Sequence, residues 1–287
     1  MLVAASGDHL LLGGSRSDHS GGDFCLGCRH RVGVTPEQQE DSLENRSRCA
    51  NGPMTTPDLT SVVSGFRPRP GDASLLSFVA AFVDTCGFVG LFQLFTAHVT
   101  GNFVLMGAAL VNRQGDVLAK LLAFPVFVVA VALTVLTADA LQRRGRSRVG
   151  PLLWVEAALL AVAVFLPYLI GSPREADDVR ALAIGMTIVL AMGLQNAMMR
   201  LDFAAMPPTT VMTGNVTQVT IDLMALWREE GAPRKIARDR LRRMAGPIIA
   251  FLLGAAGGAG GYAVLGFTSL LLPAVICGVL ARQNARR

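Results

Sequence analysis

The sequence predicts an all-α integral membrane protein with about 6–8 helical elements, as judged from the number of apolar runs. Hydrophobic residues make up 52% of the 287 residues and charged residues only 16%, whereas a soluble domain carries roughly 25% charged residues. Such a chain has too little charge to cover a soluble surface and too many apolar residues to be disordered throughout. A short motif also recurs 113 residues further along the chain, which indicates an internal repeat.

Apolar runs with at most one formal charge predict most of the helices. These runs are 74–112, 121–138, 149–173, 181–199, 203–227 and 244–281. A spanning helix needs about 20 apolar residues, so we expect two spans in the run 244–281. The glycine-rich stretch Gly257–Gly261 is the expected break between them.

The repeated motif divides the apolar region into two halves. Thr96–Asn102 and Thr209–Asn215 both end in Thr-Gly-Asn, and the same offset aligns the neighbouring apolar runs in the same order. We therefore expect a helical membrane domain over 74–283, with repeat one at about 74–170 and repeat two at about 181–283. An odd number of spans in each repeat would make the two repeats inverted, as in many transporters.

The two elements that begin with Thr-Gly-Asn leave the topology open. Eight spans result if both elements cross the membrane, six if both are re-entrant, and seven if only one crosses. The positive-inside rule favours six, because the arginine clusters 143–148 and 228–243 then share one side with both termini. We accordingly expect cytoplasmic termini, including residues 284–287 at the C-terminus.

The N-terminal residues 1–73 differ in composition from the rest of the chain. They are rich in Gly, Ser, Asp and Arg without a sustained apolar period, which is typical of a disordered tail. Met54 precedes the first apolar run, so residues 1–53 could be an upstream extension from a mis-called start. The pair Cys25 and Cys28 has no second pair nearby to complete a zinc site, and we expect no metal and no cofactor.

Polar residues within the apolar runs are the candidates for a functional site. Asp84 lies about ten residues into the first span, where a carboxylate costs about 2.5–3.5 kcal/mol on insertion scales. His98 could relay protons with Asp84 because its pKa lies near neutrality. Glycine permits a broken helix, and asparagine can satisfy the freed backbone groups. The candidate substrate or ion site consists of Asp84, His98, Thr100, Asn102, Gln195, Asn196, Thr213 and Asn215.

The segments Ala81–Phe88, Phe95–Asn102, Gly193–Ala197 and Pro208–Asn215 carry a resemblance to a known family. Together they resemble the YoaK family of bacterial multipass membrane proteins, over about residues 74–283. The family is functionally uncharacterised, so the resemblance implies an inner-membrane location and a multipass architecture but no reaction. Residues 1–53 lie outside the resemblance.

Two functions agree with these observations. The first is a transporter or channel for a small molecule or ion, with a polar site at the midplane of the bilayer where the twin motifs meet. The alternative is a non-transporting membrane scaffold or stress-response protein, because the glycine-rich segment Gly254–Gly261 suits close helix contacts.

No nucleophile is paired with a base, so we expect no enzyme and no catalytic residue. The basic residues lie beside apolar runs as in membrane loops, so the expected partner is the lipid bilayer and not nucleic acid. The sequence also allows the protein to form a homo-oligomer.

Overall fold

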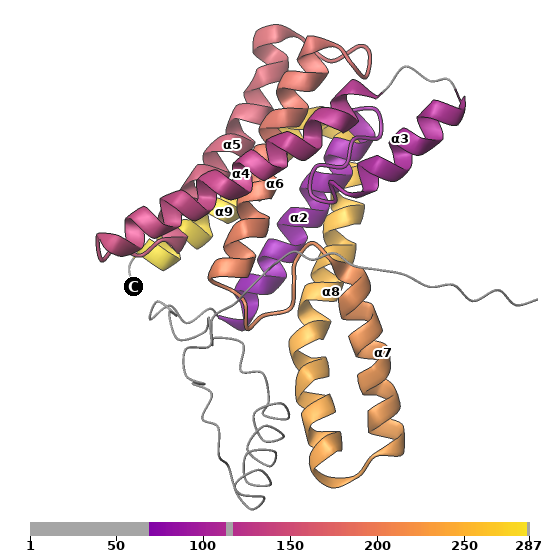
Figure 1. Cartoon of the computed structure of the whole chain (residues 1–287), viewed down its shortest axis with the longest axis vertical. Helices are drawn as coiled ribbons and strands as arrows, with labels where there is room; N and C mark the ends of the chain where they lie inside the picture. Colours follow the sequence, from indigo (N-terminus) through magenta and orange to yellow (C-terminus); the bar gives the residue numbers. More distant parts are fainter. Residues whose placement is uncertain (1–68, 113–116, 286–287) are drawn as a thin grey trace, which may run out of the picture. The chain divides into compact units, whose positions relative to one another are not determined.

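The computed structural model describes residues 69–112 and 117–285, all of which belong to the compact unit Leu59–Arg287. The predicted extension 1–53, and all of the predicted tail before Arg69, lie outside the described residues. Every regular element in the described ranges is helical, which confirms the predicted all-α class. In chain order the elements are α2 (Pro70–Gly90), α3 (Gly101–Asn112), α4 (Leu118–Arg143), α5 (Val149–Ile170), α6 (Val179–Leu201), α7 (Met212–Arg228), α8 (Gly231–Leu265), the 3-10 helix η2 (Gly266–Leu270) and α9 (Leu271–Ala285) (Figure 1).

Five helical segments of the described chain are long and apolar enough to cross a membrane. They are Gly71–Gly90, Leu118–Arg143, Val149–Ile170, Val179–Leu201 and Gly231–Asn284, the last of which contains α8, η2 and α9. By contrast, α3 is apolar but has only 12 residues, about 18 Å of helix against a hydrocarbon core of about 30 Å. The prediction of a multipass helical membrane protein is therefore confirmed at this level.

One end of the helical unit is marked by Arg148, and we call it the Arg148 end. The Arg148 guanidinium donates to the Gln142 side chain at 2.7 Å and to the backbone oxygen of Leu201 at 3.1 Å, so the ends of α4 and α6 meet the start of α5 there. Arg69, just before α2, donates to the Gln283 side chain of α9 at 3.1 Å. A buried apolar cluster also joins these helix ends, and its members include Leu76, Ala138, Val149, Met198 and Leu280.

The other end of the unit is marked by Asp177, and we call it the Asp177 end. The Asp177 carboxylate accepts from the backbone nitrogen of Ala119 at 3.0 Å, which brings the loop between α5 and α6 to the start of α4. The hydroxyls of Tyr168 and Thr268 are 2.7 Å apart, so the end of α5 meets η2. Consecutive long helices therefore run in alternating directions between the two ends (Figure 1).

The predicted helix break at Gly257–Gly261 is wrong, because this stretch lies inside α8. The chain turns instead at Gly266, whose φ of +57° is in the left-handed region that favours glycine. The earlier glycines serve packing, because a Cβ at Gly254 or Gly258 would overlap the carbonyl oxygen of Phe78 or Phe82 in α2. Their missing side chains let the backbones of α2 and α8 approach closely along their length.

The basic segment predicted as the loop 228–243 is mostly helical, because α8 begins at Gly231. Gly246 lies beside Ser74 near the start of α2, so the preceding turns of α8 extend beyond the Arg148 end. There α7 packs against α8 (Figure 1). The Arg240 guanidinium of α8 holds the Asp222 carboxylate of α7 at 2.5 Å, and the Asp222 side chain is fully buried.

Two loops fold back along the helices that they follow. After α2, residues 91–100 return until Thr96 and Ala97 contact Asp84, and α3 then begins at Gly101. After α6, residues 202–211 return until Thr210 contacts Asn196, and α7 then begins. We call these segments loop one and loop two. Loop one enters from the Asp177 end, where α2 finishes, and loop two enters from the Arg148 end, where α6 finishes.

Candidate functional site

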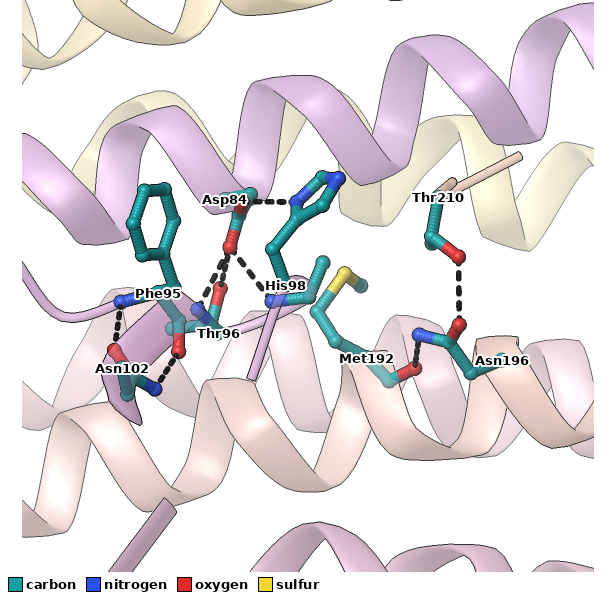
Figure 2. Close-up of polar contacts among 9 residues, drawn as sticks. Asp84, Phe95, Thr96, His98, Asn102, Met192, Asn196 and Thr210 are labelled. Atoms are coloured by element: carbon teal, nitrogen blue, oxygen red, sulfur yellow. Dashed lines mark hydrogen bonds and ion pairs between the residues drawn. The ribbon is translucent and has the colours of Figure 1, made fainter. Parts of the chain in front are cut away.

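Asp84 is the polar centre of loop one. It lies six residues before the end of α2 at Gly90 and is 5% exposed. Its Oδ1 accepts from the backbone nitrogens of Thr96 and Ala97 at 2.7 and 2.6 Å, and from the Thr96 hydroxyl at 3.2 Å. Its Oδ2 lies 2.6 Å from Nδ1 of His98 (Figure 2). These four partners offset the cost of burying a carboxylate, which is otherwise several kcal/mol.

The two oxygens of Asp84 have different partners. Oδ1 binds the loop backbone and fixes the path of residues 96 and 97, whereas Oδ2 binds only the imidazole of His98. The contact at Oδ2 can therefore break without releasing the loop from α2.

His98 connects the two loops. Its side chain is 33% exposed, and it binds Asp84 through Nδ1. It also interacts with the backbone of Thr210 in loop two. The edges of its ring contact Phe95 and Phe251, with centroids 6.3 and 6.0 Å apart. The imidazole is therefore placed where loop one, loop two and α8 come together.

Asn102 closes loop one from the first turn of α3. Its Nδ2 donates to the backbone oxygen of Phe95 at 2.8 Å, and its Oδ1 accepts from the backbone nitrogen of the same residue at 2.9 Å. The side-chain amide of Asn102 is therefore buried and hydrogen-bonded within loop one. Thr100 precedes it with an exposed side chain, and its backbone oxygen accepts from Phe103 at 3.2 Å to begin the helix.

Asn215 makes the matching contact in loop two, where its Nδ2 donates to the backbone oxygen of Pro208 at 2.8 Å. Phe95 and Pro208, like Asn102 and Asn215, are 113 residues apart. The Thr213 side chain is exposed, as is that of Thr100.

Loop two is held by side-chain amides of α6 where loop one is held by a carboxylate. The Thr210 hydroxyl donates to the Asn196 side chain at 2.6 Å (Figure 2). Gln195 donates to the Thr209 hydroxyl at 3.3 Å and to the backbone oxygen of Leu76 at 2.8 Å. Loop two is therefore held to α6 by neutral hydrogen-bonding groups, whereas loop one is held to α2 by a charged one.

The predicted site residues fall into three groups. Asp84 and His98 are bonded to each other, and Gln195 and Asn196 hold loop two. The two asparagines of the motif each close their own loop, and within the described ranges no hydrogen bond joins them. The two motif threonines are exposed, away from the buried polar contacts.

Sequence reasoning missed some residues that complete the site. Thr96 and Thr209 are fully buried and bind Asp84 and Gln195, and Thr210 binds Asn196 and contacts His98. The repeated motif contained the signal, because Thr96 and Thr209 are also separated by 113 residues. The ring contact of Phe251 with His98 had no such signal, since Phe251 lies on α8, far from His98 in the sequence.

The helices and the buried polar loops define a multipass helical membrane protein with an internally bound carboxylate. A family model described as a protein of unknown function, DUF1275, matches residues 73–282, and the chain belongs to this family. The chain is similar to the UPF0700 transmembrane protein YoaK of Bacillus subtilis (strain 168), with 32% identity over 185 residues, which cover 63% of this chain and 79% of the relative. The resemblance to the YoaK family is thus confirmed. No solved structure matches the chain.

Proposed function

We propose that this protein is a transporter or channel for a small molecule or ion, with its site at the meeting point of loop one and loop two. The observation that carries the proposal is the position of His98, which binds Asp84 in one half and contacts Thr210 in the other. A polar junction between two loops from opposite ends is the arrangement in which many secondary transporters bind their substrates. A ligand that donates a hydrogen bond or carries positive charge would replace His98 at Oδ2 of Asp84.

An inverted internal repeat is part of this proposal. Repeat one would contain α2 to α5, and repeat two would contain α6 to α9, in the same order. The pair α2 and α8 would correspond to α6 and α4, and both pairs are packed together. The matching loop closures by Asn102 and Asn215 support the same correspondence. Because loop one and loop two enter from opposite ends, the two repeats would have opposite orientations.

We propose six membrane passes, formed by α2, α4, α5, α6, α8 and η2 with α9. The elements that begin at the Thr-Gly-Asn motifs would be re-entrant, which agrees with the 12-residue length of α3. Irregular backbone at membrane depth is tolerated only where protein or water surrounds it, and the buried contacts of Asp84 and Asn102 supply that environment. The Arg148 end would face the cytoplasm of a bacterial inner membrane, because the arginine-rich segments gather there.

The scaffold function has weaker support. Its motivation was the glycine-rich segment, which could bind a partner helix. Gly254, Gly257 and Gly258 all lie against α2 of the same chain, so their close contacts do not require a partner. We propose no catalytic role, because the polar groups of the site are bound to loop backbone and to one another.

The proposal can be tested with Asp84→Asn. Asparagine retains an acceptor for the backbone nitrogens of Thr96 and Ala97 but loses the charge that binds His98. The protein should therefore insert and fold, and any transport should be lost. A matched control is Asp139→Asn, which removes an exposed carboxylate from α4.

The measurement combines solute profiles of cells with flux into liposomes. Metabolites and ions are compared among cells that lack the protein and cells that overproduce the wild type or either variant. Solutes that change are then tested in proteoliposomes, together with protons followed by an internal pH-sensitive dye. Flux that is present in liposomes with the wild type or Asp139→Asn and absent with Asp84→Asn supports the proposal. Equal flux with all three proteins contradicts it.

A further inference from the structure

Glu156 of α5 is a buried carboxyl group that the proposed site does not use. Its side chain is 0% exposed, and neither carboxyl oxygen accepts from an N–H or O–H group. Asp84 offers a direct contrast, since its two oxygens have four partners. The fold therefore provides N–H and O–H donors for Asp84 and none of these for Glu156.

Glu156 lies among buried apolar residues of α5 and beside one thiol. On α5 itself its buried neighbours include Leu153, Ala157 and Leu160. The titratable group that faces it is Cys277 of α9, which is also fully buried and carries a free thiol. The helix α6, which also packs against α5, contributes Ile188 and Met192 to the core cluster that contains Ala157 and Leu160.

An ionised carboxylate is incompatible with this environment. An unpaired charge transferred into an apolar medium is so costly that the group becomes neutral instead. A bound sodium, magnesium or calcium ion would need several oxygen ligands, and no group of three or more His, Cys, Asp or Glu side chains gathers within 69–112 and 117–285. The ligand that one carboxyl and one thiol can hold is a proton.

We propose that Glu156 is a proton-binding site of the membrane bundle, which holds its proton while α5 and α9 are packed and exchanges it when they separate. In the packed state the group is a neutral carboxylic acid. On separation water reaches it, and the acid dissociates into a carboxylate and a hydrated proton. The proposal goes beyond the proposed transport function and does not depend on the contact between Asp84 and His98.

The direct test is infrared spectroscopy of the purified protein in lipid bilayers at neutral pH. A protonated carboxyl group has a carbonyl stretching band that a carboxylate lacks. The difference spectrum between wild type and Glu156→Gln should contain one such band. Glu175→Gln removes an exposed carboxylate from the loop at the Asp177 end, and it should leave the band unchanged.

The same spectra test the exchange step. In heavy water the band should shift slowly in the wild type and faster in Gly278→Leu. A Cβ at Gly278 of α9 would already lie 3.4 Å from the Trp154 ring of α5, so the longer leucine side chain would overlap that ring and loosen the contact between the helices. Absence of a protonated carboxyl band in the wild type, or its persistence in Glu156→Gln, would overturn the proposal. Equal exchange rates in wild type and Gly278→Leu would overturn its gating part.

A second variant covers the case in which Glu156→Gln does not fold. Glu156→Met replaces a neutral acid with an apolar side chain of similar length. It should change the unfolding equilibrium by less than about tenfold, since only a weak contact with the Cys277 thiol is lost. A much larger loss would mean that the carboxylate is ionised and held by a cation, which contradicts proton binding. Because neither readout measures transport, failure here is distinguishable from failure of the site at Asp84.

Discussion

The contact between α2 and α8 can be tested by adding one methyl group at Gly258. A Cβ at this position would overlap the carbonyl oxygen of Phe82 and lie 3.0 Å from its carbonyl carbon and Cα. These are backbone atoms of α2, which cannot move independently of the helix. Gly258→Ala therefore forces α8 away from α2 or distorts one of the two helices.

The size of the effect follows from a comparison with Gly260→Ala. A Cβ at Gly260, in the same helix, meets no atom within 4 Å. Both substitutions gain about 0.5–1 kcal/mol from the lower backbone entropy of alanine in the unfolded chain. That gain cancels between the two variants, and overpacking of about 1–3 kcal/mol remains. Gly258→Ala should therefore be less stable than Gly260→Ala by about 1–3 kcal/mol.

The assay is thermal or chemical unfolding of both variants in detergent, followed by a fluorogenic thiol reagent. Cys86 and Cys277 are buried and free in the folded protein, so they react only on unfolding. Cys25, Cys28 and Cys49 are first replaced by serine to remove their background. If the two glycine variants differ by less than about 0.5 kcal/mol, the close approach of α2 and α8 that underlies the overpacking argument is refuted.

The remaining predictions concern orientation and loop closure. Reporter fusions after Arg148 and after Arg243 should both read cytoplasmic, and a fusion near Glu175 should read on the opposite side; a reversed pattern would contradict the six-pass orientation. Asn102→Ala should destabilise the protein by about 1–3 kcal/mol because it leaves a buried backbone donor and acceptor without a partner. Asn215→Ala leaves only one backbone acceptor unpaired, so the thiol assay should show a smaller decrease in the free energy of unfolding. An equal or larger decrease would contradict the unequal roles of the two asparagines.

The sequence singled out Asp84 as a candidate but did not predict its contacts. Asp84 was recognisable because a lone charge in an apolar run is costly and rare. Its partners were not, because backbone nitrogens such as those of Thr96 and Ala97 carry no mark in the sequence. The sequence predicts the motif residues Thr100 and Thr213 as site residues, and the structure shows that both have exposed side chains, beside the start of α3 and in the first turn of α7.

The glycine-rich part of α8 shows how one composition permits two structures. Several glycines in an apolar run can break a helix or allow two helices to pack closely. The choice depends on whether another backbone lies against them, and α2 lies against Gly254 and Gly258. The actual turn depends on one residue, Gly266, with its positive φ.

The sequence by itself determined the environment of this protein, its helical class and the order of its elements, because hydrophobic length and charge are properties of local segments. The repeated Thr-Gly-Asn motif also marked where the regular helices are interrupted. Only the tertiary structure decided which groups meet, because contacts such as those of His98 with Thr210 join segments more than a hundred residues apart. The tertiary structure also decided the surroundings of the two buried acids. Asp84 accepts from four N–H and O–H groups of loop one, whereas Glu156 accepts from none.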